Sequence, residues 1–139
     1  ALKKLKGFDA YSQSKLACLM FSYELQRRLT AINSSVISVC AHPGVSITSI
    51  GQNLPKTLLK MQDKFGSLIF SDSENGALPT LFAALNKDVK GGDYFGPNGL
   101  LEFKGKVKKV DSTKMSQDED IAKTLWKYSE ELTGGEFVV

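Results

Sequence analysis

The sequence is poor in the residues that build metal sites and disulfides. Its 139 residues include two cysteines, Cys18 and Cys40, and a single histidine, His42. It has no Cys-x-x-Cys spacing, so it offers no recognisable set of metal ligands, and we expect no metal. Both cysteines lie among apolar residues, which favours buried, reduced thiols and a reducing compartment such as the cytoplasm.

Long apolar runs and strong charge are also missing. No stretch of 18 apolar residues occurs, so no membrane-spanning helix is expected, and the first residues form no signal-peptide pattern. The chain begins with Ala1 rather than Met, which leaves room for a preceding segment that could anchor it to a membrane. A net charge of +3 does not by itself indicate binding to nucleic acid or membrane. With 42% apolar residues, the chain can bury the core of about one domain.

A tyrosine and a lysine at helical spacing form the first candidate site. Tyr11 and Lys15 begin an apolar segment that we expect to be helical from Ala10 to Leu29, so both would lie on one helix face. A cation near a phenol stabilises the phenolate, so such a pair can pass a proton to or from a reacting oxygen. The spacing alone is common in a lysine-rich chain and identifies no family.

The same helix is apolar nearly all round through Leu25. Its expected wet end consists of Glu24, Gln26, Arg27 and Arg28. A helix that is apolar on more than one face is buried on more than one side. One face could then pack on a sheet and another on a second subunit.

A short run rich in β-branched residues, from Ser35 to Ala41, follows the helix. It lacks alternation, which predicts a strand covered on both faces, as in a parallel sheet. A helix followed by such a strand is half of a βαβ unit and predicts an α/β fold. Pro43 and Gly44 come next, and ligands of open α/β sheets bind at the carboxyl ends of strands. This turn is the second candidate site.

The middle of the chain is expected to contain a loop and a helix. The loop runs from Leu54 to Phe70, and its short amphipathic piece, Thr57 to Phe65, is either a lid or a surface helix. A capping box, Ser71 to Glu74, opens a helix through Leu85, which Pro79 should kink or delay.

The last third is expected to hold two strands and a helix. Tyr94 and Phe95 predict a very short strand. The stretch from Leu100 to Val110 reads as a solvated edge strand rather than a basic ligand patch; its lysines are Lys104, Lys106, Lys108 and Lys109.

A second capping box, Ser116 to Glu119, opens a helix that runs to Leu132 and is ended by Gly134 and Gly135. Its expected buried residues are Ile121, Leu125, Trp126 and Leu132.

In this order and spacing, these features resemble the second half of a short-chain dehydrogenase/reductase. The residues that carry the resemblance are Tyr11-Ser-Gln-Ser14-Lys15, then Pro43-Gly44, and Thr48 four residues later. Residues 77–80 and 93–97 resemble the retinol dehydrogenase-like and WW-domain oxidoreductase-like branch. The implied fold is α/β, the C-terminal part of a doubly wound, parallel-sheet Rossmann-type fold with three α/β/α layers in the complete protein. Residues 1–139 would be the C-terminal half of a single domain.

The resemblance implies an NAD(P)-dependent oxidoreductase that moves a hydride between nicotinamide and a carbonyl or alcohol. Tyr11 would be the general acid/base, and Lys15 would stabilise its phenolate and bind the nicotinamide ribose, so both would contact the cofactor. NADP(H) is favoured over NAD(H). The resemblance also suggests a homodimer or homotetramer formed through the Ala10 to Leu29 helix. The residues that would hold the carboxamide and nearby phosphate are Pro43, Gly44, Val45, Ser46 and Thr48.

Two positions follow the family pattern less directly. Ser46 stands where the family usually has a branched aliphatic residue, and His42 is expected to be structural. The stretch from Leu54 to Phe70 matches the variable substrate loop of the family, so it does not reveal the substrate. The candidates for substrate contact are Leu54, Leu58 and Met61.

Several parts of the family pattern are absent from the chain. The glycine-rich dinucleotide turn, the residue that selects NAD or NADP, and the catalytic Asn and Ser lie upstream in the family, and no Ser precedes Tyr11 here. The resemblance therefore implies a missing N-terminal half and an inactive isolated chain. The alternative is a truncated, non-catalytic family member that acts as a dimerisation or regulatory module through residues 10–29. A nucleic-acid binder that uses Lys104 to Lys109 is the least favoured interpretation.

Overall fold

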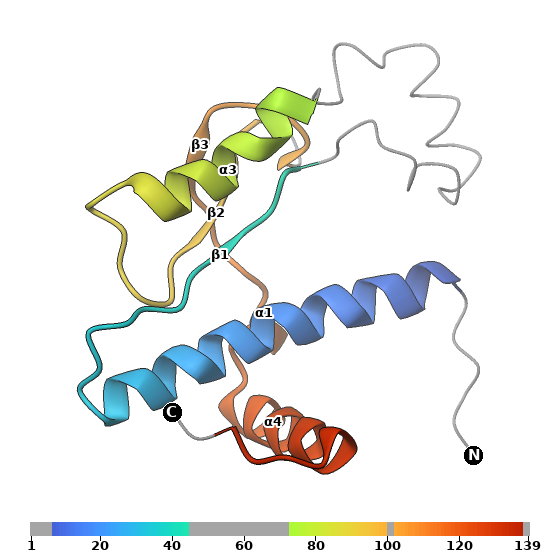
Figure 1. The fold of residues 1–139 in the computed structure, drawn as a ribbon. Helices are drawn as coiled ribbons and strands as arrows, with labels where there is room; N and C mark the ends of the chain where they lie inside the picture. The colour runs from blue at the N-terminus through green and yellow to red at the C-terminus, as the bar shows by residue number, and fades with distance from the viewer. Residues whose placement is uncertain (1–6, 45–72, 100–101, 138–139) are drawn as a thin grey trace. The chain divides into compact units, whose positions relative to one another are not determined.

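A computed structural model describes residues 7–44, 73–99 and 102–137 (Figure 1). These residues form helices and a mixed sheet, which confirms the α/β fold class. The elements in chain order are α1 (Gly7–Ala31), β1 (Cys40–Ala41), α3 (Ser73–Leu85), β2 (Tyr94–Pro97), β3 (Val107–Lys109), the 3₁₀ helix η3 (Met115–Gln117) and α4 (Glu119–Thr133).

The chain divides into two compact units. The first consists of Ala1–Val39, Lys90–Asp93 and Ser112–Val139, and the second consists of Cys40–Val89 and Tyr94–Asp111. The first unit therefore contains α1, η3 and α4, and the second contains α3 and the sheet. No described helix is long and apolar enough to cross a membrane.

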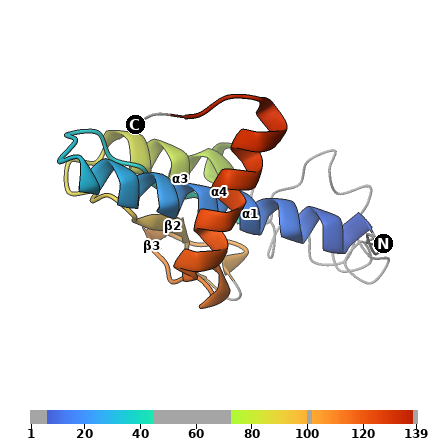
Figure 2. The ribbon, with the colours of Figure 1, turned by 90° about the horizontal axis from the view of Figure 1, so that it is seen from below.

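The core of the first unit lies where α4 crosses α1, as Figure 2 shows. Trp126 of α4 is almost completely buried. The Phe21 ring of α1 stacks on it with centroids 4.8 Å apart, and the Arg28 guanidinium lies 4.3 Å from the Trp126 ring. One aromatic side chain of α4 thus holds an aromatic and a cationic side chain of α1, which fixes the two helices together.

The helix predicted from Ala10 to Leu29 is confirmed, but its burial is less extensive than expected. Within the first unit, Tyr11, Lys15 and Cys18 lie on an exposed face of α1, and burial begins at Met20. The reason is the length of α4, which crosses α1 and covers only part of it (Figure 2). The prediction of a buried thiol was therefore wrong for Cys18, while Cys40 is half-buried; both cysteines are free.

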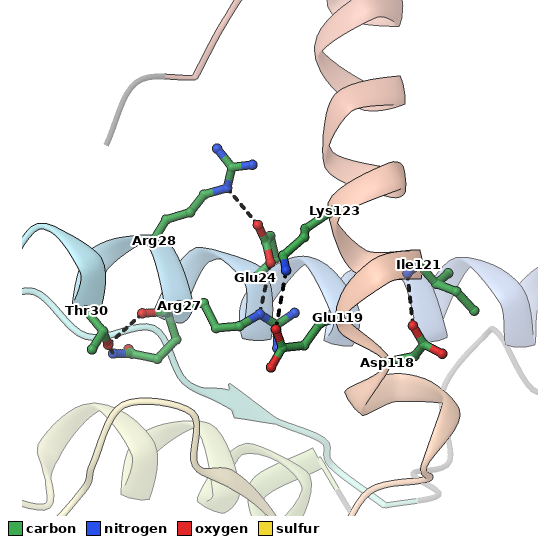
Figure 3. A network of polar contacts seen from close by, with 9 residues as sticks. Glu24, Arg27, Arg28, Thr30, Asp118, Glu119, Ile121 and Lys123 are labelled. Atoms are coloured by element: carbon green, nitrogen blue, oxygen red, sulfur yellow. Dashed lines mark hydrogen bonds and ion pairs between the residues drawn. The ribbon is translucent and has the colours of Figure 1, made fainter.

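Glu24 also differs from its expected place at the wet end of α1. Only 3% of its surface is exposed. Its two carboxylate oxygens accept hydrogen bonds from the Nε atoms of Arg27 and Arg28, each at 2.9 Å (Figure 3). A buried carboxylate needs such partners, and the pattern of residue types did not reveal that these arginines turn back toward Glu24 rather than toward water.

The helix predicted after residue 116 is confirmed with a different cap. Asp118, not Ser116, is the N-cap of α4, and its carboxylate accepts a hydrogen bond from the Ile121 N–H at 3.0 Å (Figure 3). Ser116 instead lies fully buried in η3 and donates its hydroxyl proton to the Thr113 carbonyl. Gly134 ends the helix in a left-handed conformation, as expected.

Two of the four buried residues predicted for this helix are exposed. Trp126 is buried and Leu125 partly so, whereas 49% of Ile121 and 70% of Leu132 are exposed. The core-facing side of α4 is narrower than the sequence suggested, because within the first unit Trp126 and the small residue Ala122 fill the contact with α1.

The second unit is built on a three-stranded sheet in the order β1-β2-β3. Strands β1 and β2 are parallel, with Cys40 opposite Tyr94, and β3 runs antiparallel to β2, with Val107 opposite Pro97. The prediction of a parallel strand is confirmed, and so are the short strand at residues 94–95 and the edge strand, which among the described residues is β3.

The parallel strand is much shorter than the predicted Ser35 to Ala41. Val36 and Ile37 are exposed, and the ladder contains only Cys40 and Ala41. A strand requires hydrogen-bonding partners along its length, and β2 begins only at Tyr94. The chain before β1 is held differently, since the Ser38 N–H donates to Oε1 of Gln26 at 2.7 Å.

Helix α3 packs on the sheet in the second unit (Figure 1). Its Phe82 ring lies 5.2 Å from the ring of Phe95 in β2. Pro79 is buried within α3, which already begins at Ser73, so the proline does not delay the helix. The capping residue proposed at Ser71, like the amphipathic piece from 57 to 65, lies outside the described residues.

Candidate functional site

Tyr11 and Lys15 share one face of α1, as their spacing predicts. The Lys15 ammonium lies 5.5 Å from the centre of the Tyr11 ring. Within the first unit both side chains are exposed, with 48% of Tyr11 accessible. Ser14, between them, donates its hydroxyl proton to the Tyr11 carbonyl at 2.7 Å and is thus engaged with its own helix. The geometry thus places a phenol and a neighbouring cation together on one exposed face of the helix.

The turn after β1 is shaped by a glycine that no other residue can replace without strain. Gly44 has φ +72°, in the left-handed region, and a Cβ placed there would lie 2.5 Å from the Phe103 carbonyl oxygen and 2.8 Å from that of Glu102. Pro43, directly before it, is exposed. The packing of residues 102–103 against the turn is therefore one of the contacts that hold its shape.

His42, which was expected to be structural, contacts Gly44, Glu102 and Tyr94. Its Nδ1 accepts a hydrogen bond from the Gly44 N–H at 3.3 Å. Its Nε2 lies 3.2 Å from Oε2 of Glu102, an ion-pair distance without the geometry of a hydrogen bond. The ring also lies 5.1 Å from the ring of Tyr94. Burial lowers the pKa of His42 below its ordinary 6.5, and the Glu102 carboxylate acts in the opposite direction.

Glu102 is the residue of this region that sequence reasoning missed. It belongs to the stretch from Leu100 to Val110, interpreted there only as an edge strand. Its φ of +56° is unusual for a residue with a side chain. No spacing links Glu102 to His42, because the two are brought together only by the folding of distant segments.

The remaining predicted site residues lie outside the described residues. They are Val45, Ser46 and Thr48 of the turn and Leu54, Leu58 and Met61 of the substrate loop. Of the predicted residues that are described, Tyr11 and Lys15 belong to the first unit, and Pro43 and Gly44 belong to the second. Among the described residues, no group of three or more His, Cys, Asp or Glu side chains could hold a metal ion.

Comparisons with known proteins give a consistent set of relatives, although no family model matches the chain. The chain is 32% identical to the polyprenol dehydrogenase of Danio rerio over 125 residues, and 32% identical to retinol dehydrogenase 14 of Mus musculus over 128 residues. It is also 32% identical over 120 residues to a short-chain dehydrogenase/reductase of Macrophomina phaseolina. These alignments cover 90%, 89% and 86% of the chain. The resemblance to the short-chain dehydrogenases/reductases is confirmed.

The chain spans only part of these relatives. It covers 36% of the polyprenol dehydrogenase, 35% of the retinol dehydrogenase and 57% of the fungal protein. A solved structure likewise matches nearly all of the chain, while the chain covers less than half of that protein. An uncharacterised protein from Mycobacterium paratuberculosis matches 99% of the chain with a TM-score of 0.75 and 34% identity, and the match covers 43% of that protein.

Proposed function

We propose that this chain is the part of an NAD(P)-dependent oxidoreductase that supplies the proton-transfer pair. The observation that carries the proposal is the Tyr11–Lys15 pair on an exposed face of α1. This pair occurs in a chain that is 32% identical to proteins named dehydrogenases. Position and chemistry both support it, since an exposed phenol beside a cation suits exchange of a proton with a ligand.

Tyr11 acts as the general acid/base. In the oxidative direction, the proton of the substrate hydroxyl passes to the Tyr11 phenolate while the hydrogen on the carbinol carbon leaves with its electron pair as a hydride. A carbonyl group results. Lys15 favours the phenolate through its charge and binds the nicotinamide ribose. Bound NAD(P) supplies the hydride chemistry, as acceptor or donor.

The turn at Pro43 and Gly44 is proposed to line the nicotinamide end of the cofactor site. The Gly44 N–H already donates to His42, so the contribution of Gly44 is its backbone conformation rather than a donor of its own. This conformation requires glycine, because a Cβ would overlap the carbonyl oxygens of residues 102 and 103. The contacts of Val45, Ser46 and Thr48 with the carboxamide and phosphate, and the preference for NADP(H), belong to this proposal.

The relatives suggest which substrate to test first. Retinol and polyprenol, after which two of them are named, are both isoprenoid primary alcohols. We therefore propose a lipophilic primary alcohol, or the corresponding aldehyde, as the substrate class. All-trans-retinol and a short polyprenol are the first probes, with retinal and NADPH for the reverse direction.

The test is turnover by the complete protein with Tyr11→Phe. Loss of the phenol oxygen should lower kcat by about 10²- to 10⁴-fold, whereas NADPH affinity should change little because the ring and Lys15 remain. Tyr128→Phe is the matched control, since Tyr128 is also exposed and lies on a helix of the same unit. Turnover by Tyr11→Phe equal to that of Tyr128→Phe would rule out the proposed role.

A further inference from the structure

The His42 side chain joins three segments of the second unit that are distant in the sequence. It follows β1, contacts the Gly44 N–H two residues on, lies beside Tyr94 of β2, and faces the Glu102 carboxylate. The ring also packs so closely over Gly96 that a Cβ there would overlap it. The imidazole is therefore held on several sides and has little freedom to rotate.

The hydrogen bond to Gly44 determines where the imidazole carries its proton. A ring nitrogen that accepts an N–H has no proton of its own. Since Nδ1 accepts from Gly44, the proton of the neutral ring is on Nε2, the atom that faces Glu102. The Glu102 carboxylate, although not in hydrogen-bond geometry, favours a proton at Nε2 and so favours the tautomer that leaves Nδ1 free to accept.

The conformation of the Pro43–Gly44 turn depends on the hydrogen bond to His42 together with close packing around Gly44. Gly44 lies against the carbonyls of Glu102 and Phe103 and the Pro97 ring, and both Gly44 and Glu102 have positive φ. The Gly44 peptide is held in one orientation by two contacts. These are the packing against residues 102–103 and the hydrogen bond from its N–H to Nδ1 of His42.

We propose that His42 is a positioning residue for the Pro43–Gly44 turn, with Glu102 holding its imidazole in the tautomer that accepts the Gly44 N–H. Its consequence for cofactor binding rests on the proposed function. Protonation of Nδ1 replaces the acceptor by a second N–H directed at the Gly44 N–H, which releases the turn. NADP(H) affinity therefore falls as the imidazole becomes charged.

The charged and titratable groups around the ring set the pH at which this occurs. Glu102 faces Nε2 directly and Tyr94 lies beside the ring from β2. The neighbouring elements carry Glu74 in the first turn of α3 and Lys108 and Lys109 in β3. Burial lowers the pKa of His42 below its ordinary 6.5, so the ring is neutral and the turn is held at neutral pH, and the turn is released as the pH falls through that lowered pKa.

Two substitutions separate the two nitrogens of the ring. His42→Asn places an amide oxygen close to the position of Nδ1, so it retains an acceptor for the Gly44 N–H and removes the titration. His42→Gln places its amide near the position of Nε2, so it reaches toward Glu102 and leaves Gly44 without an acceptor. The two variants have the same chemistry and differ by one methylene.

The experiment is a titration of the complete protein with NADPH, followed by nicotinamide fluorescence, from pH 5.5 to 8. At pH 7.5, His42→Asn should bind like wild type and His42→Gln about 3- to 10-fold more weakly, the effect of one lost hydrogen bond. Wild-type affinity should fall toward pH 5.5 more steeply than that of His42→Asn, which lacks the titration of this imidazole. Equal affinities and slopes for all three proteins would overturn the inference.

A spectroscopic measurement separates failure of this inference from failure of the proposed function. In ¹⁵N spectra, the histidine signal that His42→Asn lacks should show a bare Nδ1 at pH 7.5, and Glu102→Gln should lower its titration midpoint. A bare Nδ1 without NADPH binding at any pH would reject the proposed function and leave the contact in place. A protonated Nδ1 at pH 7.5 would overturn the inference whether or not NADPH binds.

Discussion

At the scale of the residue, Gly44 cannot be replaced by a residue with a side chain without both backbone strain and overlap. Its left-handed φ and the two carbonyl oxygens beside it exclude a side chain for separate reasons. Gly134 has a similar φ, +70°, with no atom near the position of a Cβ, and Gly135 has neither constraint. The chain thus contains three glycines that separate the effect of backbone strain from that of crowding.

Alanine substitutions at these three glycines should give graded losses of stability. We expect Gly135→Ala to leave the free energy of unfolding nearly unchanged and Gly134→Ala to lower it by about 1 kcal/mol through backbone strain. Gly44→Ala adds overlap with two carbonyls and should lower it by roughly 2–4 kcal/mol. Denaturant unfolding of the three variants measures this, and equal losses for Gly44→Ala and Gly134→Ala would contradict the described packing.

The sequence predicted which residues of the candidate site share a helix face, but it did not predict the contacts made by side chains from distant segments. Spacing alone placed Tyr11 and Lys15 on one helix face, because the period of a helix is local. It could not identify Glu102 as the partner of His42, because the two residues lie on segments distant in the sequence. The burial of Glu24 between Arg27 and Arg28 was also missed, because it depends on how the side chains turn.

At the scale of the element, helices were predicted more accurately than strands. The long helix α1 was recognised from its apolar segment, and the C-terminal helix α4 from its capping residues and terminal glycines, because these are local signals. The strand β1 was predicted too long, because its ladder is limited by the start of β2 at Tyr94. Cap identity was also missed, since Ser116 and Asp118 are both good N-cap residues and only the η3 turn decides between them.

The cap of α4 supplies a prediction at this scale. Asp118→Ala should lower the free energy of unfolding by about 1 kcal/mol, because the Ile121 N–H loses its acceptor at the helix start. Asp118→Asn retains an acceptor and should lose much less. Far-ultraviolet circular dichroism during denaturant unfolding measures both. A full-sized loss for Asp118→Asn as well would show that charge, not capping, stabilises this end.

At the scale of the whole molecule, the α/β class and the family resemblance followed from the order of motifs and are supported by relatives and by a solved structure. The sequence did not indicate the two compact units, because compactness depends on contacts between distant segments. The chain spans about a third of the polyprenol and retinol dehydrogenases it matches. The expected glycine-rich turn, the catalytic Ser and the oligomer formed through residues 10–29 stay predictions.

The central claim is that Tyr11 and Lys15 lie in a binding site for a nicotinamide cofactor. NADPH binding to the complete protein tests this claim most directly. Wild type should enhance nicotinamide fluorescence saturably, with NADH as the comparison. Lys15→Met should weaken binding by about 10-fold or more, since a hydrogen bond from a charged group is lost. Lys127→Met, on the exposed side of α4, should bind like wild type. No saturable enhancement by wild type, or equal affinity for the two lysine variants, would contradict the account.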